Sequence, residues 1–122
     1  MLNSYRELTV WQKSIDLVIG IYTLTKRFPK EELFGITSQI RRAAVSIPAN
    51  IAEGYSRKHR LEYMQFLRIS FASGAELETH LLIAKRLNLA SESSFEKIES
   101  LLTEVMKMLN ALIATLNTHP KP

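Results

Sequence analysis

The sequence predicts an all-α protein, an antiparallel up-and-down four-helix bundle that forms a single domain over residues 1–122. Apolar residues recur every three or four positions in four successive segments, which is the period of an α-helix that buries one face. Prolines, glycines and polar residues separate these segments into short connections, which favour antiparallel neighbours. With 122 residues, 46% of them hydrophobic, the chain is long enough to bury one core. The expected helices span residues 10–28, 36–55, 60–87 and 94–117.

The first expected helix carries two apolar stripes. Thr9 and Gln12 have the spacing of a capping box at its start, and Pro29 ends it. One stripe consists of Val10, Leu17, Ile21, Leu24 and Phe28, and the other of Trp11, Ile15, Val18 and Tyr22. A surface helix of a monomeric bundle needs only one apolar face. The second stripe is either additional bundle core or an oligomer interface, where aromatic residues are enriched, and we take its four residues as the interface candidates.

The second expected helix contains a proline. Pro48 has no N–H to donate to the Ala44 carbonyl oxygen, which costs about 3 kcal/mol in a regular helix interior. Ile51 nevertheless continues the apolar stripe of this helix beyond the proline. We therefore expect the helix to be kinked at Pro48 rather than ended by it, with Ser46 or Asn50 supplying local polar groups.

The last two expected helices differ in how clearly the sequence defines them. The third contains small residues at positions 70–75, which either let a neighbouring helix approach closely or simply weaken the helix propensity. The fourth follows a possible capping box of Ser93 and Glu96. Its apolar seam, the strongest helical signal in the chain, alternates steps of three and four residues through Phe95, Ile98, Leu102, Val105, Leu109, Leu112 and Leu116.

The sequence contains no recognisable constellation of catalytic or metal-binding residues. The chain has no cysteine, which excludes disulfides, cysteine-ligated zinc and thiol catalysis. Its serines lie in no nucleophile elbow, and there is no phosphate-binding loop. Glu76, Glu78 and His80 lack the Glu-x-x-His spacing of di-iron bundles, so Glu76 and His80 are better explained as an i,i+4 pair. We therefore predict no enzyme activity, no catalytic residues, no cofactor and no metal.

Neither secretion nor membrane insertion is indicated by the sequence. The N-terminus lacks the basic region and the continuous apolar run of a signal peptide. The richest apolar run, residues 17–24, is short and interrupted by Gly20 and Thr23. Together with the absence of cysteine, this composition suits the cytoplasm, and no membrane partner is expected.

The net charge of +4 is concentrated in one part of the chain. Residues 36–70 contain six basic and two acidic side chains, whereas the remainder is balanced. The six basic residues, which are the candidates for nucleic-acid binding, are Arg41, Arg42, Arg57, Lys58, Arg60 and Arg68. Cations clustered at a turn, as at residues 57–60, can contact phosphates without specific geometry. A merely solvated turn has the same composition, so both interpretations stay open.

Arg41 and Arg42 are adjacent and project about 100° apart around a helix. One of them can therefore form a salt bridge inside the bundle while the other faces solvent. Glu78 and Glu53 are the candidate internal partners. A structural role for at least one of these arginines competes with a role in binding.

Four segments of the chain resemble a known bacterial family. The segments are residues 8–13 (LTVWQK), 28–29 (FP), 37–53 and 76–81 (ELETHL). They are similar in content and order to the S23-type four-helix-bundle proteins, which are encoded in intervening sequences of 23S ribosomal RNA genes and include retroelement accessory proteins. The resemblance covers residues 8–116 and implies a ring-like homopentamer with a basic surface suited to nucleic acid.

From these observations we expect a self-associating bundle that binds RNA or another nucleic acid electrostatically. The alternative is a structural or adaptor oligomer whose basic face meets an acidic protein or a protein that is itself bound to nucleic acid. Salt dependence distinguishes the two, because the log affinity of nucleic-acid binding falls linearly with log salt, whereas an apolar adaptor interface responds little.

Overall fold

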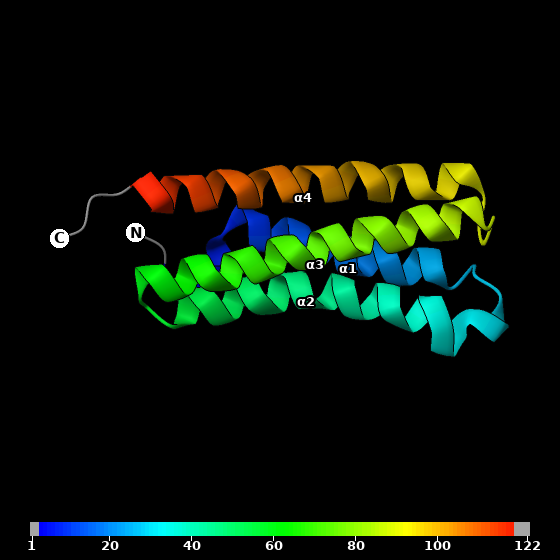
Figure 1. Ribbon diagram of the computed structural model, residues 1–122, viewed down its shortest axis with the longest axis horizontal. Helices are drawn as coiled ribbons and strands as arrows, with labels where there is room; N and C mark the ends of the chain where they lie inside the picture. The colour runs from blue at the N-terminus through cyan, green and yellow to red at the C-terminus, as the bar shows by residue number, and fades with distance from the viewer. Residues whose placement is uncertain (1–2, 119–122) are drawn as a thin grey trace.

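The computed structural model describes residues 3–118, which form four long helices packed side by side (Figure 1). The helices are α1 (Thr9–Thr25), α2 (Ser38–Ser56), α3 (Arg60–Arg86) and α4 (Glu92–Thr118). This part of the chain contains no strand. The predicted all-α fold class is therefore confirmed.

The four helices lie along one long axis, and the chain reverses direction at each connection (Figure 1). Helix α1 packs against α2 and α4, and α3 packs against the same two helices. The closest pair is α2 with α3. This order places the face formed by α1 and α2 on the side of the bundle opposite the face formed by α3 and α4.

The start of α1 differs from the predicted capping box. Thr9 already belongs to the helix, and Leu8 precedes it in extended conformation without a side-chain cap. Gln12 Nε2 instead donates a hydrogen bond to the Arg6 carbonyl oxygen at 2.9 Å. A short 3₁₀ helix, η1 (Tyr5–Glu7), brings that carbonyl within reach, so the predicted pairing of Thr9 with Gln12 is wrong.

The connection between α1 and α2 is longer than predicted. Helix α1 ends at Thr25 rather than at residue 28, and α2 begins at Ser38 rather than at residue 36. Two short helical segments, η2 (Lys30–Glu32) and η3 (Leu33–Thr37), occupy the connection. Within η3 the backbone of Gly35 leaves helical geometry, with φ −110° and ψ −116°, so the chain changes direction there before it enters α2.

Helix α2 continues through Pro48, as the apolar pattern predicts. Ser70 Oγ of α3 donates to the Ile47 carbonyl oxygen at 2.9 Å, immediately before the proline. Asn50 Nδ2 donates to the carbonyl oxygen of Ser46 at 2.8 Å and to its Oγ at 2.9 Å. Side chains from both helices thus satisfy polar groups around the proline. The prediction that the helix does not end there is confirmed, while the kink itself stays a prediction.

The start of α4 also differs from its predicted capping box. The helix begins at Glu92, so Ser93 lies inside the first turn rather than at the N-cap position. The Ser94 backbone N–H donates to the Ser91 carbonyl oxygen at 2.9 Å, and the hydroxyl oxygens of these two serines lie 2.6 Å apart. The predicted pairing of Ser93 with Glu96 is wrong, because the chain enters the helix at an earlier serine.

The hydrophobic core extends along the bundle between the four helices. Phe95 is fully buried, and its ring packs against Phe28 with centroids 6.1 Å apart. The predicted α4 seam is buried from Phe95 to Leu109, and Leu112 and Leu116 pack half-buried against the core. The first apolar stripe of α1 is also buried throughout. These helices are therefore held mainly by burial of the stripes that the sequence shows.

Tyr63 on α3 has a hydroxyl group that is buried without a hydrogen-bond partner among residues 3–118. Its ring lies edge-on to the Tyr55 ring, with centroids 5.6 Å apart. Burial and, secondarily, the neighbouring Tyr55 phenol raise the pKa of Tyr63 from 10.0 to about 12. The proton of this hydroxyl is therefore held more tightly in the folded state than in the unfolded chain.

Tyr63→Phe is expected to raise the free energy of unfolding by roughly 1 kcal/mol at neutral pH, because it removes an unpaired buried hydroxyl and keeps the ring. Between pH 10 and about 12 the unfolded wild type loses the phenolic proton while the folded state retains it, so wild-type stability falls as the pH rises. The variant lacks this component. Urea unfolding at neutral pH and across the alkaline window measures both effects, and an identical alkaline loss in the two proteins contradicts the prediction.

Candidate functional site

Close packing of α2 on α3 positions a basic turn at one end of the bundle. A Cβ atom on Gly54 would lie 2.6 Å from the Phe66 Cβ and 3.2 Å from the Tyr63 carbonyl oxygen, so glycine lets the two backbones converge before the turn. Lys58 then takes the left-handed backbone conformation, with φ 56°. This conformation is uncommon outside glycine and reverses the chain within a few residues.

Arg57 is partly neutralised by two carboxylates. One of its terminal nitrogens lies 3.0 Å from Glu53 Oε2, and the other lies 3.6 Å from Glu62 Oε1. Its guanidinium also lies over the Phe66 ring, 5.1 Å from the centroid. The side chain is 47% exposed, so one face of the guanidinium is still open to a ligand.

Arg60 caps the far end of α4. Its Nη1 donates to the Leu116 carbonyl oxygen at 2.9 Å and lies 3.8 Å from Met64 Sδ. A cation at a helix C-terminus is favourable, because the last carbonyl groups have no partners within the helix. Lys58 is the exposed cation of this turn whose side chain forms no hydrogen bond or ion pair within the described residues.

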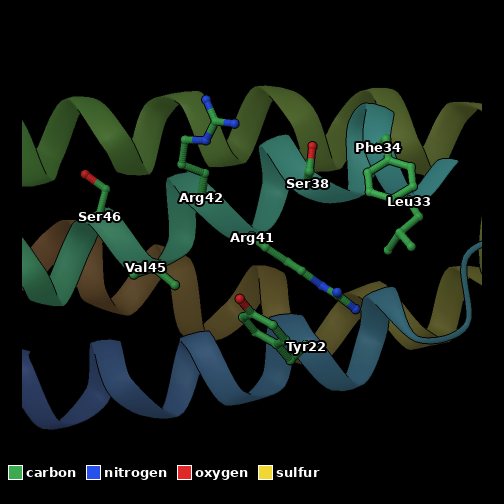
Figure 2. Close-up of a pocket in the computed structure, with 8 residues that line it drawn as sticks. All are labelled: Tyr22, Leu33, Phe34, Ser38, Arg41, Arg42, Val45 and Ser46. Atoms are coloured by element: carbon green, nitrogen blue, oxygen red, sulfur yellow. The ribbon is translucent and has the colours of Figure 1, made fainter.

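Arg41 and Arg42 leave α2 in different directions, as their sequence separation predicts (Figure 2). Arg41 is half-buried; its Nε donates to Thr25 Oγ1 at 2.9 Å, and its guanidinium lies 4.6 Å from the centroid of the Tyr22 ring. The expected pairing of Arg41 or Arg42 with Glu53 or Glu78 is not found in the described part of the chain. Glu53 instead binds Arg57, and the partners of Arg41 are the Thr25 hydroxyl and the Tyr22 ring. Arg42 is exposed on the α3 side.

The structure does not gather the six candidate cations into one patch. Arg42 and Arg57 are separated by four turns of α2, roughly 22 Å at 1.5 Å per residue. Arg68 is exposed on α3, between these two levels of the bundle. The positive charge is therefore distributed along α2 and α3, with its highest density at residues 57–60.

The second stripe of α1 is only partly available as an oligomer interface. Trp11, Ile15 and Val18 are half-buried. Trp11 also packs edge-on against Tyr5, with ring centroids 5.3 Å apart. Tyr22 is 38% exposed, so it is the most accessible member of the stripe. Packing within the bundle already buries much of this stripe. The part of it that is accessible to a second molecule is the surface around Tyr22.

A groove next to Tyr22 contains the most exposed large apolar side chain in the described chain. Phe34, in the connection before α2, is 93% exposed, and the groove has a volume of about 610 Å³. Its lining residues come from α1, η3 and α2 (Figure 2): Tyr22, Leu33, Phe34, Ser38, Arg41, Arg42, Val45 and Ser46. We call it the basic groove. Phe34 was not among the candidates predicted from the sequence, although a phenylalanine in a connection, outside any helical stripe, is itself a signal of an exposed apolar site.

A second groove lies between α3 and α4. It has a volume of about 410 Å³ and is lined by Glu78, Thr79, Leu81, Leu82, Glu99, Leu102 and Thr103. We call it the acidic groove. Leu82 is 47% exposed, and Glu99 is bound by Lys85 with a nitrogen to oxygen distance of 3.2 Å. Glu78 is exposed and forms no ion pair with any of residues 3–118.

Within the described chain, two further ion pairs join Lys13 with Glu104 and His80 with Glu76. His80 Nε2 lies 3.3 Å from Glu76 Oε2, the i,i+4 pair expected from the sequence. Among residues 3–118, no three His, Cys, Asp or Glu side chains are grouped closely enough to hold a metal ion. None of the described helices combines the length and the hydropathy needed to cross a membrane.

The described residues thus form an all-α helical bundle with charged and apolar grooves on its surface. The family model of the 23S rRNA-intervening sequence protein matches residues 6–111, so the chain belongs to that family. A solved structure of a protein of unknown function from the S23 ribosomal protein family of Bacteroides thetaiotaomicron VPI-5482 is similar, with 28% sequence identity and a TM-score of 0.80. The similarity covers 86% of this chain and 98% of that one. No curated protein matches the chain.

Proposed function

We propose that this protein is a non-enzymatic, self-associating four-helix bundle that binds RNA or another nucleic acid through the turn between α2 and α3. The observation that carries the proposal is the group of three cations at residues 57–60, which lies at the end of the bundle within the segment that holds the whole net positive charge. Phosphate backbones are attracted to such a group without any specific base contact.

The existing contacts of Arg57 and Arg60 do not use all of their hydrogen-bonding capacity. A guanidinium has five N–H donors, and the contacts of Arg60 with Leu116 and Met64 use Nη1. Arg57 is still about half exposed beside its two carboxylates. Lys58 supplies the exposed charge, and the two arginines add directed donors.

Self-association makes a modest charge per chain effective. Each chain contributes a net charge of +4, which gives weak binding when a single turn contacts phosphate. Several turns held in one assembly bind the same strand at a high effective concentration. The family, whose name refers to an intervening sequence of 23S rRNA, makes RNA the first nucleic acid to test. A homopentamer, the assembly implied by the resemblance, has a mass of five times 14.0 kDa in light scattering.

Replacing Arg57, Lys58 and Arg60 together by glutamine is expected to weaken binding to unrelated single-stranded RNAs. The slope of log affinity against log salt should flatten by up to about 2 per chain, because about 0.7 counterions are released for each phosphate contact on a single strand. Fluorescence anisotropy at several salt concentrations measures the slope, and circular dichroism checks that the variant is still helical.

A matched control carries the same change of charge at the other end of the bundle. Lys26, Lys30 and Arg86 are all exposed near the opposite connections, and their triple glutamine variant should keep the wild-type slope. Equal slopes for all three proteins would contradict the proposed site. Binding of an acidic protein that the triple variant loses, in the absence of RNA binding by the wild type, would support the adaptor interpretation instead.

A further inference from the structure

The basic groove has the composition of a docking surface. Phe34 is 93% exposed and lines the groove together with Leu33 and Val45, which are 42% and 43% exposed. Burying such a cluster is favourable, and monomeric proteins rarely leave large contiguous apolar groups in water. The side chain of Arg42 lines the same groove without a hydrogen bond or ion pair to any described residue, and the described residues that line the groove include no carboxylate.

The acidic groove has the complementary composition. Leu81, Leu82 and Leu102 form its apolar floor, and the lining residues include two glutamates and no cation. Lys85 already binds Glu99, so Glu78 remains to accept a cation from elsewhere. An apolar side chain flanked by a cation on one surface thus matches an apolar groove flanked by an anion on the other.

The positions of the two grooves allow them to contact each other only between two molecules. The basic groove is formed by α1, η3 and α2, whereas the acidic groove is formed by α3 and α4, on another face of the bundle. Both lie in the half of the bundle that contains the start of α2 and the end of α3 (Figure 1). Because the grooves lie at the same level along the bundle, a second copy placed alongside with its helices parallel can bring its acidic groove against the basic groove of the first.

We propose that the basic groove of one chain docks on the acidic groove of a second copy of this chain, with Phe34 packing against Leu82 and Arg42 meeting Glu78. This inference rests on the self-association proposed above and assigns its two surfaces. The contact is heterologous, since each copy uses two different surfaces, and its repetition closes a ring when the rotation divides a full turn. The stoichiometry then follows from the angle between the grooves.

Charge reversal tests the pairing in the full-length chain. Phe34→Ala, Arg42→Glu and Glu78→Arg should each weaken self-association at least about tenfold, which lowers the mass observed in a dilution series by light scattering. Combining Arg42→Glu with Glu78→Arg restores the opposite charges in exchanged positions. The double variant should therefore recover most of the wild-type mass, which loss of folding in a single variant cannot explain.

Two control variants lie outside both grooves. Leu87→Ala removes a 58% exposed apolar side chain at the end of α3, and Arg86→Glu reverses a neighbouring exposed charge. Both should keep the wild-type mass, and circular dichroism should show the same helicity for every variant. The comparison separates loss of this contact from general effects of charge or apolar area.

The possible results distinguish failure of self-association from failure of the groove pairing. A wild-type mass of 14.0 kDa at every concentration overturns self-association and this pairing together, but leaves binding at residues 57–60 to its own test. An oligomeric wild type that Phe34→Ala leaves unchanged, or a double variant no larger than the single ones, overturns only the pairing. Weaker RNA binding by Phe34→Ala at unchanged mass also overturns it, because the exposed ring then stacks on a nucleobase.

Discussion

Replacing Phe95 by alanine is expected to lower the free energy of unfolding by about 3–5 kcal/mol. The side chain is fully buried at the start of α4, and its ring packs against Phe28 from the end of α1. Alanine would remove the transfer free energy of the ring and leave a cavity at the end of the bundle where two connections meet. Urea unfolding followed by circular dichroism measures the difference.

Leu61→Ala is the control for this substitution, because Leu61 is 54% exposed on α3. Its effect should stay within about 0.5 kcal/mol. A loss below about 1 kcal/mol for Phe95→Ala would mean that the core at this end collapses around the cavity, contrary to the packing described here.

Gly54→Ala is the second substitution with a large expected effect. In an exposed helix, alanine stabilises by up to about 1 kcal/mol relative to glycine. At Gly54 the new methyl group would meet the Phe66 Cβ and the Tyr63 carbonyl oxygen, neither of which can rotate away. We expect a net destabilisation of about 1–3 kcal/mol, because α2 and α3 have to move apart. Thermal and urea unfolding both report it.

Gly74→Ala is a matched control with the same chemical change in α3. There the new methyl group would meet the thioether of Met106, a flexible side chain with several rotamers. This variant should be destabilised clearly less than Gly54→Ala. Equal losses would show that the closeness of α2 to α3 at Gly54 is not the cause.

The elements that the sequence predicts well are those whose stability comes from burial of a regular stripe. The α4 seam from Phe95 to Leu109 is buried as its three-and-four spacing implies, and Ile51 correctly predicts that α2 passes Pro48. Both predictions depend on the helical period, which local sequence contains completely. Helix ends depend on which polar group happens to be within reach, so the predicted capping boxes at Thr9 and Ser93 are wrong.

The candidate site was less predictable, because charge clusters in sequence do not reveal their partners in space. The engagement of Arg60 with the Leu116 carbonyl oxygen joins residues 56 positions apart. The carboxylates expected for Arg41 are replaced by Thr25 Oγ1 and the Tyr22 ring, which no local pattern indicates. The exposure of Phe34 similarly depends on how η3 meets α2, and therefore on backbone geometry at Gly35.

The hydrogen bonds around Pro48 also affect which helices unfold together. The Ile47 carbonyl oxygen of α2 accepts from Ser70 of α3, and the Ser46 hydroxyl oxygen lies 2.8 Å from that of Ser73. These contacts link α2 to α3 immediately before the proline, so opening one helix removes polar partners from the other. The cooperative unit is the α2–α3 hairpin rather than either helix, so amide protons on the two sides of it should exchange with solvent in the same opening event.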